Sequence, residues 1–323
     1  MSAPDDSTLE LNRTEYSEFV RVLASKPHLR SLRLTGTTIT HAYIKKIATL
    51  RQLVSLDLSS CTIQCPIREL RKCTSLTDLS LNSCDRRCSE SSSGVSFRLA
   101  DFRDWKSDTL TSLDLSQLDP SLGNHKEDSL QYVCKACPRL HTLILEFNRE
   151  LSEVTPLATL TQLHYLNLGG TSVKSLVPLQ ALTTLNSLSL AYIPLDFGEE
   201  DDNTQAAVVP DLAPLAKLKN LQELDIRKSS LTDAQLMVLA QNHNGQTSYN
   251  IKYCTSLSPE KVEQFRQAVA PCEVIYALEP PSTTQSLDTS SDSPEWISEE
   301  VHRRIAGCAV ACLGILTAVA MAT

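Results

Sequence analysis

Two cysteines have a spacing that could support chemistry. Cys134 and Cys137 form a C-x-x-C pair, which can serve a redox centre or supply half of a zinc site. A structural zinc site needs a second such pair nearby, whereas Cys61 and Cys65 have a different spacing and lie far away in the sequence. The glycine-rich nucleotide loops, the H-E-x-x-H motif and the G-x-S-x-G motif are all missing. We therefore expect a protein that is not an enzyme and that carries no cofactor and no metal.

A second group of residues could bind a macromolecule. It combines aromatic, imidazole and carboxylate side chains, in a chain of which only 5% is aromatic. Aromatic side chains dominate the binding energy at protein interfaces, and exposed apolar patches often mark such sites. The alternative is that Phe147 and Tyr192 pack as additional core. The predicted protein-binding residues are Phe147, Tyr165, Tyr192, His141, His164, Glu146, Ile144 and Asn167.

A leucine pattern positions these residues. The register L-x-x-L-x-L recurs at least eight times, with starts at Leu29, Leu53, Leu76, Leu110, Leu140, Leu163, Leu185 and Leu221. In a short strand the fourth and sixth positions point inward, and the residue between them points outward. The ninth position holds Asn148 and elsewhere smaller residues such as Cys61 and Thr171, which we expect to satisfy buried backbone groups.

This pattern resembles that of leucine-rich repeat proteins over about residues 29–257. The resemblance implies the α/β class, in the form of a curved solenoid with a parallel sheet and about nine repeats. Each repeat buries its leucines only against its neighbours, so the array must stack. Its concave sheet is suited to holding another macromolecule, and we expect a protein-interaction scaffold or adaptor with an unknown protein partner.

Two finer resemblances leave alternatives open. The short repeats around residues 154–185 resemble the 22-residue class of internalins and of a regulatory subunit of protein phosphatase 1. The stretch from Cys134 to Leu140 resembles the cysteine-containing repeats of F-box substrate receptors. The alternatives are therefore a phosphatase regulator and a substrate-recognition subunit of a ubiquitin ligase, although the 28 residues before the first repeat are too few for an F-box.

The repeat register divides the chain into regions. Residues 1–28 are expected to form a capping helix region, with Thr14 as the helix N-cap. Residues 29–278 form the solenoid, with inserted loops at 86–105 and 196–210 that are expected to be disordered because of their serine-rich and acidic composition.

The C-terminal part differs in composition. Residues 279–304 predict a flexible linker rich in proline, serine and threonine. Residues 305–323 carry no charge and follow Arg303 and Arg304, which predicts a transmembrane tail anchor on a cytosol-facing membrane. Small residues in this segment predict weak homo-oligomerisation. The alternative is a helix packed on protein, which would leave the protein otherwise cytoplasmic.

Charge and cysteine usage exclude other classes. The net charge is −8 and the basic residues are scattered, so we expect no nucleic-acid partner. The N-terminal residues contain no apolar run typical of a signal peptide. Eleven cysteines without clusters at the ends of the repeat array favour a reducing compartment.

Overall fold

The computed structural model describes residues 7–84, 97–118, 129–193 and 211–278. The chain divides into two units, Met1–Glu279 and Pro280–Thr323. The second unit, and with it the predicted linker and tail anchor, lies outside the described residues, as does the acidic insertion at 196–210. Within the described part of the chain, no helix is both long enough and apolar enough to cross a membrane.

The first unit is built on one long sheet, in which every neighbouring pair of strands is parallel. The predicted register holds from strand to strand, since Leu56 pairs with Leu79, and Leu143 pairs with Leu166. The strands in spatial order are β1 (Thr8–Asn12), β2 (Ser31–Thr35), β4 (Ser55–Asp57), β6 (Asp78–Ser80), β7 (Ser112–Asp114), β8 (Thr142–Ile144), β9 (Tyr165–Asn167), β10 (Ser187–Ser189), β11 (Glu223–Asp225), β12 (Ser248–Asn250) and β13 (Val274–Ile275).

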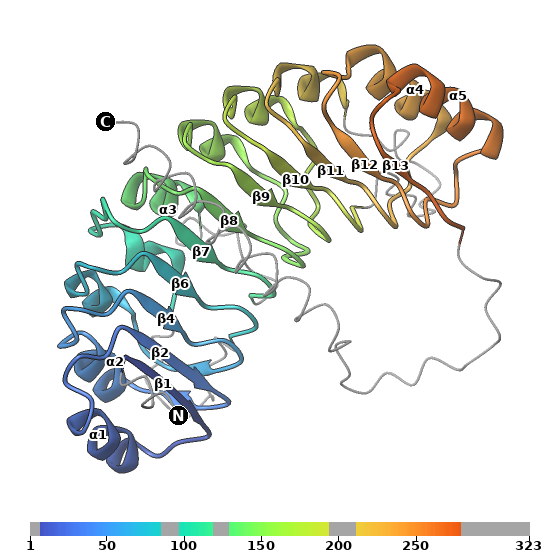
Figure 1. Cartoon of the computed structure of the whole chain (residues 1–323). Helices are drawn as coiled ribbons and strands as arrows, with labels where there is room; N and C mark the ends of the chain where they lie inside the picture. The colour runs from blue at the N-terminus through green and yellow to red at the C-terminus, as the bar shows by residue number, and fades with distance from the viewer. Residues whose placement is uncertain (1–6, 85–96, 119–128, 194–210, 279–323) are drawn as a thin grey trace, which may run out of the picture. The chain divides into compact units, whose positions relative to one another are not determined.

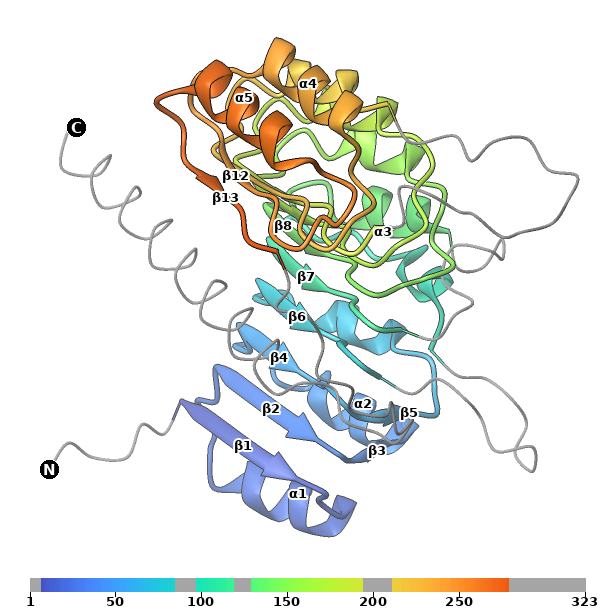
Figure 2. The ribbon, with the colours of Figure 1, turned by 90° about the vertical axis from the view of Figure 1, so that its right-hand side faces the viewer.

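Helices and 3₁₀ turns lie along the outer side of the curve, opposite the strands (Figure 1, Figure 2). The shortest repeats have room only for 3₁₀ turns. Several of these turns have a proline as their second residue, and its fixed φ suits the first turn of a helix. These outer elements are α1 (Tyr16–Ala24), α2 (His41–Ile47), η1 (Arg68–Lys72), η2 (Leu99–Phe102), α3 (Leu130–Ala136), η4 (Thr155–Thr159), η5 (Val177–Ala181), η6 (Ala213–Lys217), α4 (Asp233–Asn242) and α5 (Pro259–Val269). The short strands β3 (Thr38–Ile39) and β5 (Thr62–Ile63) pair separately. The α/β leucine-rich repeat solenoid that the sequence predicts is therefore confirmed.

Leucines and ninth-position residues hold adjacent repeats together. The inward side chains Leu56 and Leu166 are both 0% exposed, within one continuous core. The Asn148 amide donates to the carbonyl oxygens of Leu115 at 2.9 Å and Leu145 at 2.8 Å, so it joins two repeats. Cysteine thiols make weaker contacts of the same kind at this position, such as Cys61 Sγ with Leu34 O at 3.2 Å.

The N-terminal region contains more than the predicted capping helix. Strand β1 pairs with β2 and forms an incomplete additional repeat. Thr14 is not the N-cap of α1, because Glu15 holds that position. Thr14 instead occupies the ninth position of the incomplete repeat, where its N–H donates to Thr37 Oγ1 at 3.2 Å and its carbonyl accepts from the Tyr43 hydroxyl at 2.6 Å.

The expectation of a disordered loop over residues 86–105 is wrong for its second half. Phe97 and Phe102 are fully buried, and Trp105 stacks on Phe102 with ring centroids 5.0 Å apart. Asp101 is also buried, where it accepts a hydrogen bond from Arg68 Nε at 2.7 Å. This stretch fills the outer side of a long repeat with aromatic side chains together with Leu99, while residues 86–96 lie outside the described part.

Candidate protein-binding face

The concave face is formed by the third, fifth and seventh positions of each repeat. A fifth-position Asp or Asn accepts a hydrogen bond from the N–H two residues later, as Asp57 Oδ1 does from Ser59 at 2.8 Å. Asp114 does so from Ser116 at 2.9 Å, and Asn167 from Gly169 at 2.8 Å. These side chains stabilise the turn at the end of each strand. The recurring D-L-S triplets could have revealed this role, which the search for a binding surface missed.

The predicted binding residues fall into two groups. At the start of strands β8 and β9, the rings of His141 and His164 meet edge to face with centroids 5.1 Å apart. Tyr165 follows directly, at the third position of its repeat. Burial lowers the pKa of the partly buried His141, and the positive charge of His164 acts in the same direction. The neutral form of His141 is therefore favoured at neutral pH.

The second group lies at the opposite ends of the strands. Phe147 and Tyr192 both occupy eighth positions, and their ring centroids are 5.4 Å apart. They meet across Gly170 of the intervening repeat, where a Cβ atom would lie 2.4 Å from Phe147 Cδ1. The eighth-position row continues at Lys228, whose Nζ lies 5.6 Å from the Tyr192 ring centre and 5.5 Å from that of Tyr253. We call Phe147, Tyr192, Lys228 and Tyr253 the aromatic row.

Tyr165, although it is one of the predicted binding residues, does not belong to this row. A third and an eighth position are separated by five residues, or about 16 Å along an extended chain. Phe147, Tyr165 and Tyr192 lie in consecutive repeats, but Tyr165 occupies a different position along its strand. The structure instead joins Phe147 directly to Tyr192.

Three predicted binding residues are buried. Ile144 is 1% exposed, Asn167 is 4% exposed and Glu146 is 7% exposed, so the expectation that they are exposed is wrong. Side chains on neighbouring strands are only about 4.8 Å apart, and they cover one another even on the outward side of a sheet. The Asn167 amide donates to Glu146 Oε2 at 3.1 Å. Glu146 and Asn167 therefore form part of the floor of the concave face.

Burial also changes the ionisation of the carboxyl groups on the concave face. It raises the pKa of Glu146 to about 7, against the opposing effects of the Arg227 charge and the Asn167 hydrogen bond. The negative charges of Asp114 and Asp225 raise it further. Arg227 itself forms an ion pair with Asp225, with Nε and Oδ2 3.2 Å apart. Burial likewise raises the pKa of Asp78, against the Thr77 hydroxyl.

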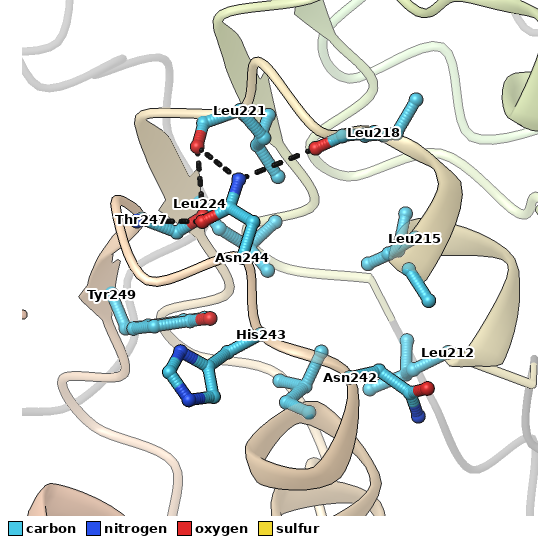
Figure 3. A pocket seen from close by; sticks show the side chains of 12 residues that line it. Leu212, Leu215, Leu218, Leu221, Leu224, Asn242, His243, Asn244, Thr247 and Tyr249 are labelled. Atoms are coloured by element: carbon cyan, nitrogen blue, oxygen red, sulfur yellow. Dashed lines mark hydrogen bonds between the residues drawn. The ribbon is translucent and has the colours of Figure 1, made fainter.

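Two hollows of very different size lie among the described residues. Figure 3 shows a cavity of about 20 Å³ near the C-terminal repeats, which is room for about one water molecule. Some of the polar groups drawn there are bonded to one another: Asn244 Nδ2 donates to Leu221 O at 2.8 Å, and Asn244 Oδ1 accepts from Thr247 Oγ1 at 2.9 Å. A shallow groove of about 490 Å³ between η4 and η5 is open to solvent on the outer side.

Both cysteines of the predicted pair are buried in the repeat core. Cys134 and Cys137 are free thiols buried at the end of α3, and burial raises the pKa of each to about 12. A thiol with such a pKa is a poor nucleophile and a poor metal ligand at neutral pH. Over the same described ranges, no cluster of three or more His, Cys, Asp or Glu side chains could hold a metal ion.

The parallel sheet and its register define a leucine-rich repeat solenoid, and comparisons with solved structures agree. The chain is similar to an internalin, InlF, from Listeria monocytogenes, with a TM-score of 0.58 and 20% identity over 84% of this chain and 68% of the internalin. Internalin C2 of the same organism gives a TM-score of 0.45 with 21% identity, covering 77% of this chain and 81% of that one. The functional domain of InlJ gives 0.41 with 13% identity, covering 76% of this chain and 49% of that domain. Compared by sequence, the chain matches no protein-family model and no curated protein.

Proposed function

We propose that this solenoid is a non-enzymatic scaffold that binds a partner protein on its concave face, at the aromatic row. The observation that carries the proposal is the contact between Phe147 and Tyr192 across Gly170. Both rings are only partly buried, and neither belongs to the leucine core. Partly exposed aromatic side chains are the residue type most enriched at the centres of protein interfaces.

The backbone at these residues supports the same assignment. Phe147 and Tyr192 both have a φ of +57°, in the left-handed region where bulky side chains are strained. The equivalent positions of two other repeats hold Gly36 and Gly170, with φ of +56° and +64°. Glycine therefore fits this turn without strain, and the turn itself does not require an aromatic side chain.

A double replacement tests the proposal. Phe147→Ala with Tyr192→Ala should weaken capture of the principal crosslinked partner by about thirtyfold or more, because losing one interface hot spot typically costs about 2 kcal/mol. Circular dichroism and the melting temperature should stay close to those of the unmodified protein. Tyr132→Ala on α3 is the matched control, since it removes an aromatic ring from the outer side. If the double variant retains the partner as well as the control does, the concave-face assignment is wrong.

Membrane attachment is a separate proposal. Residues 305–323 contain no charged side chain and follow Arg303 and Arg304, which supports a helix that anchors the solenoid to a cytosol-facing membrane and self-associates weakly. Deleting residues 305–323 should convert a carbonate-resistant membrane protein into a soluble one. Full-length protein that is soluble without detergent would contradict the anchor and favour a helix packed on protein.

A further inference from the structure

The centre of the concave face is acidic. From β4 to β10, the third, fifth and seventh positions contain no lysine or arginine among the described residues. The same positions hold four carboxylates, Asp57, Asp78, Asp114 and Glu146. Arg33 on the neighbouring strand β2 pairs with the first of these, with its Nε 2.7 Å from Asp57 Oδ2. The other three carboxyl groups, Asp78, Asp114 and Glu146, lie on or shortly after β6, β7 and β8.

Glu146 connects this acidic centre to the aromatic row. It directly precedes Phe147, and its Cγ lies 3.5 Å from where a Cβ on Gly169 would be. Its hydrogen-bond partner is the neutral Asn167 amide, and the charge of Arg227, which also forms an ion pair with Asp225, favours its ionised form. Glu146 is 7% exposed, so its carboxyl lies in the floor of the face directly beside a partly exposed ring.

The aromatic row already demonstrates one such cation contact. Lys228 Nζ lies between the rings of Tyr192 and Tyr253, at 5.6 and 5.5 Å from their centres. Within the described residues, no basic side chain is found over the ring of Phe147. A guanidinium group can stack on an aromatic face and pair with a carboxylate through the same planar side chain, which an ammonium group does less well.

We propose that the partner bound at the concave face presents a basic segment, and that an arginine of this segment pairs with Glu146 beside Phe147. This inference rests on the proposed function, because it names the chemistry of the partner at the same site. Charge complementarity across an interface also accelerates association and excludes acidic competitors.

Binding of a cation here is coupled to a proton. The Glu146 carboxyl has a pKa of about 7, and the groups that act on it are Asn167, Arg227, Asp114 and Asp225. A guanidinium favours the ionised carboxylate, so binding displaces the proton and affinity rises as the pH increases through about 7. Protonation of His141, directly before β8, would also weaken binding of a basic partner at low pH, so a variant is needed to assign the pH dependence to Glu146.

A fluorescent nona-arginine peptide is a suitable probe for the full-length protein. Its affinity, measured by anisotropy, should rise about tenfold between about pH 6 and about pH 8, as the ionised fraction of Glu146 rises from about one tenth to nine tenths. The Glu146→Gln variant should bind the peptide at both pH values with an affinity close to that of the unmodified protein at about pH 6. Glu263→Gln on α5 removes an equal charge from an exposed outer helix and should leave both affinities unchanged. A nona-glutamate peptide should not bind.

The outcomes separate this inference from the proposed function. If nona-arginine binds Glu146→Gln and Glu263→Gln equally, the attraction is a property of the net charge, and the pairing with Glu146 is wrong. If the natural partner is lost on replacing Phe147 and Tyr192 but is kept unchanged by Glu146→Gln, the scaffold proposal holds and the basic-segment inference fails. If the partner is kept by all of these variants, both are wrong.

Discussion

At the residue scale, direction and exposure are different properties. The alternation of the strands correctly directs Ile144, Glu146 and Asn167 toward the concave side, but it does not show that neighbouring strands cover them. Coverage depends on the side chains of the adjacent repeats, which the sequence of one repeat does not contain. The ninth position was easier to predict, because Asn148 must satisfy carbonyl groups in any stacked repeat.

Asn167 should therefore contribute to stability. Asn167→Ala removes the hydrogen bonds to Glu146 Oε2 and from the Gly169 N–H, and it leaves both groups in a buried setting. Loss of such partners typically costs about 1–3 kcal/mol. Urea unfolding should show this decrease, whereas Asn186→Ala, at a partly exposed second position, should change the unfolding free energy by less than about 0.5 kcal/mol. Equal effects of the two replacements would contradict the burial of Asn167.

Gly170 should be required for the aromatic contact. Gly170→Ala places a methyl group 2.4 Å from Phe147 Cδ1, so the ring must move away from Tyr192. Gly245→Ala is a matched control, because Gly245 also has a positive φ but no atom within 4 Å of a new Cβ. Both variants should lose about 1 kcal/mol from backbone strain, and only Gly170→Ala should also lose partner binding. Equal binding by both variants would show that the position of the Phe147 ring does not matter.

At the element scale, the sequence predicts repeats well wherever leucines mark the register. It fails over residues 97–105, where the buried side chains Phe97, Phe102 and Trp105 lie within a charged, serine-rich stretch without the leucine register. It also fails at β1, because Leu9 and Leu11 alone do not complete the six-residue pattern. In both places the segment is ordered because it packs against a neighbouring repeat, and its local sequence pattern does not predict this.

The turn η2 should therefore behave as core. Phe102→Ala removes a ring that is 0% exposed and stacks on Trp105, which should cost about 3–5 kcal/mol of unfolding free energy. The comparison is Phe147→Ala, which removes the same side chain from a partly exposed site and should cost much less. Melting temperatures measured by circular dichroism would distinguish the two. A similar, small loss for both would restore the description of residues 97–105 as a loose insertion.

At the scale of the whole solenoid, each repeat depends on its neighbours, so one central charge should affect several repeats. Leu166 is fully buried and pairs across the sheet with Leu143 and Leu188. Leu166→Asp would bury a carboxylate without a partner, which is energetically expensive. Hydrogen exchange should then show loss of protection on both sides of β9 together. Loss confined to one repeat would contradict a continuous core.

The acidic centre should also affect the stability of the solenoid. The pKa of Glu146 is about 7 in the fold, above its ordinary value of 4.5, so the folded state holds this proton more tightly than the unfolded state. Its contribution to stability is therefore complete below about pH 4.5 and is lost as the pH rises through about 7. His141 acts in the opposite direction, because its pKa is lowered in the fold and its neutral form is favoured as the pH rises. The difference in unfolding free energy between Glu146→Gln and the unmodified protein isolates the contribution of Glu146 from that of His141.

In urea unfolding, we compare the unfolding free energy of Glu146→Gln with that of the unmodified protein at the same pH. The advantage of Glu146→Gln should be larger at about pH 8 than at about pH 5, by an amount on the order of 2 kcal/mol. Nona-arginine should stabilise the unmodified protein more than Glu146→Gln at the higher pH, because the bound cation compensates the buried charge. A difference that does not change with pH would mean that Glu146 is ionised throughout, and the coupling between protonation and binding would be absent.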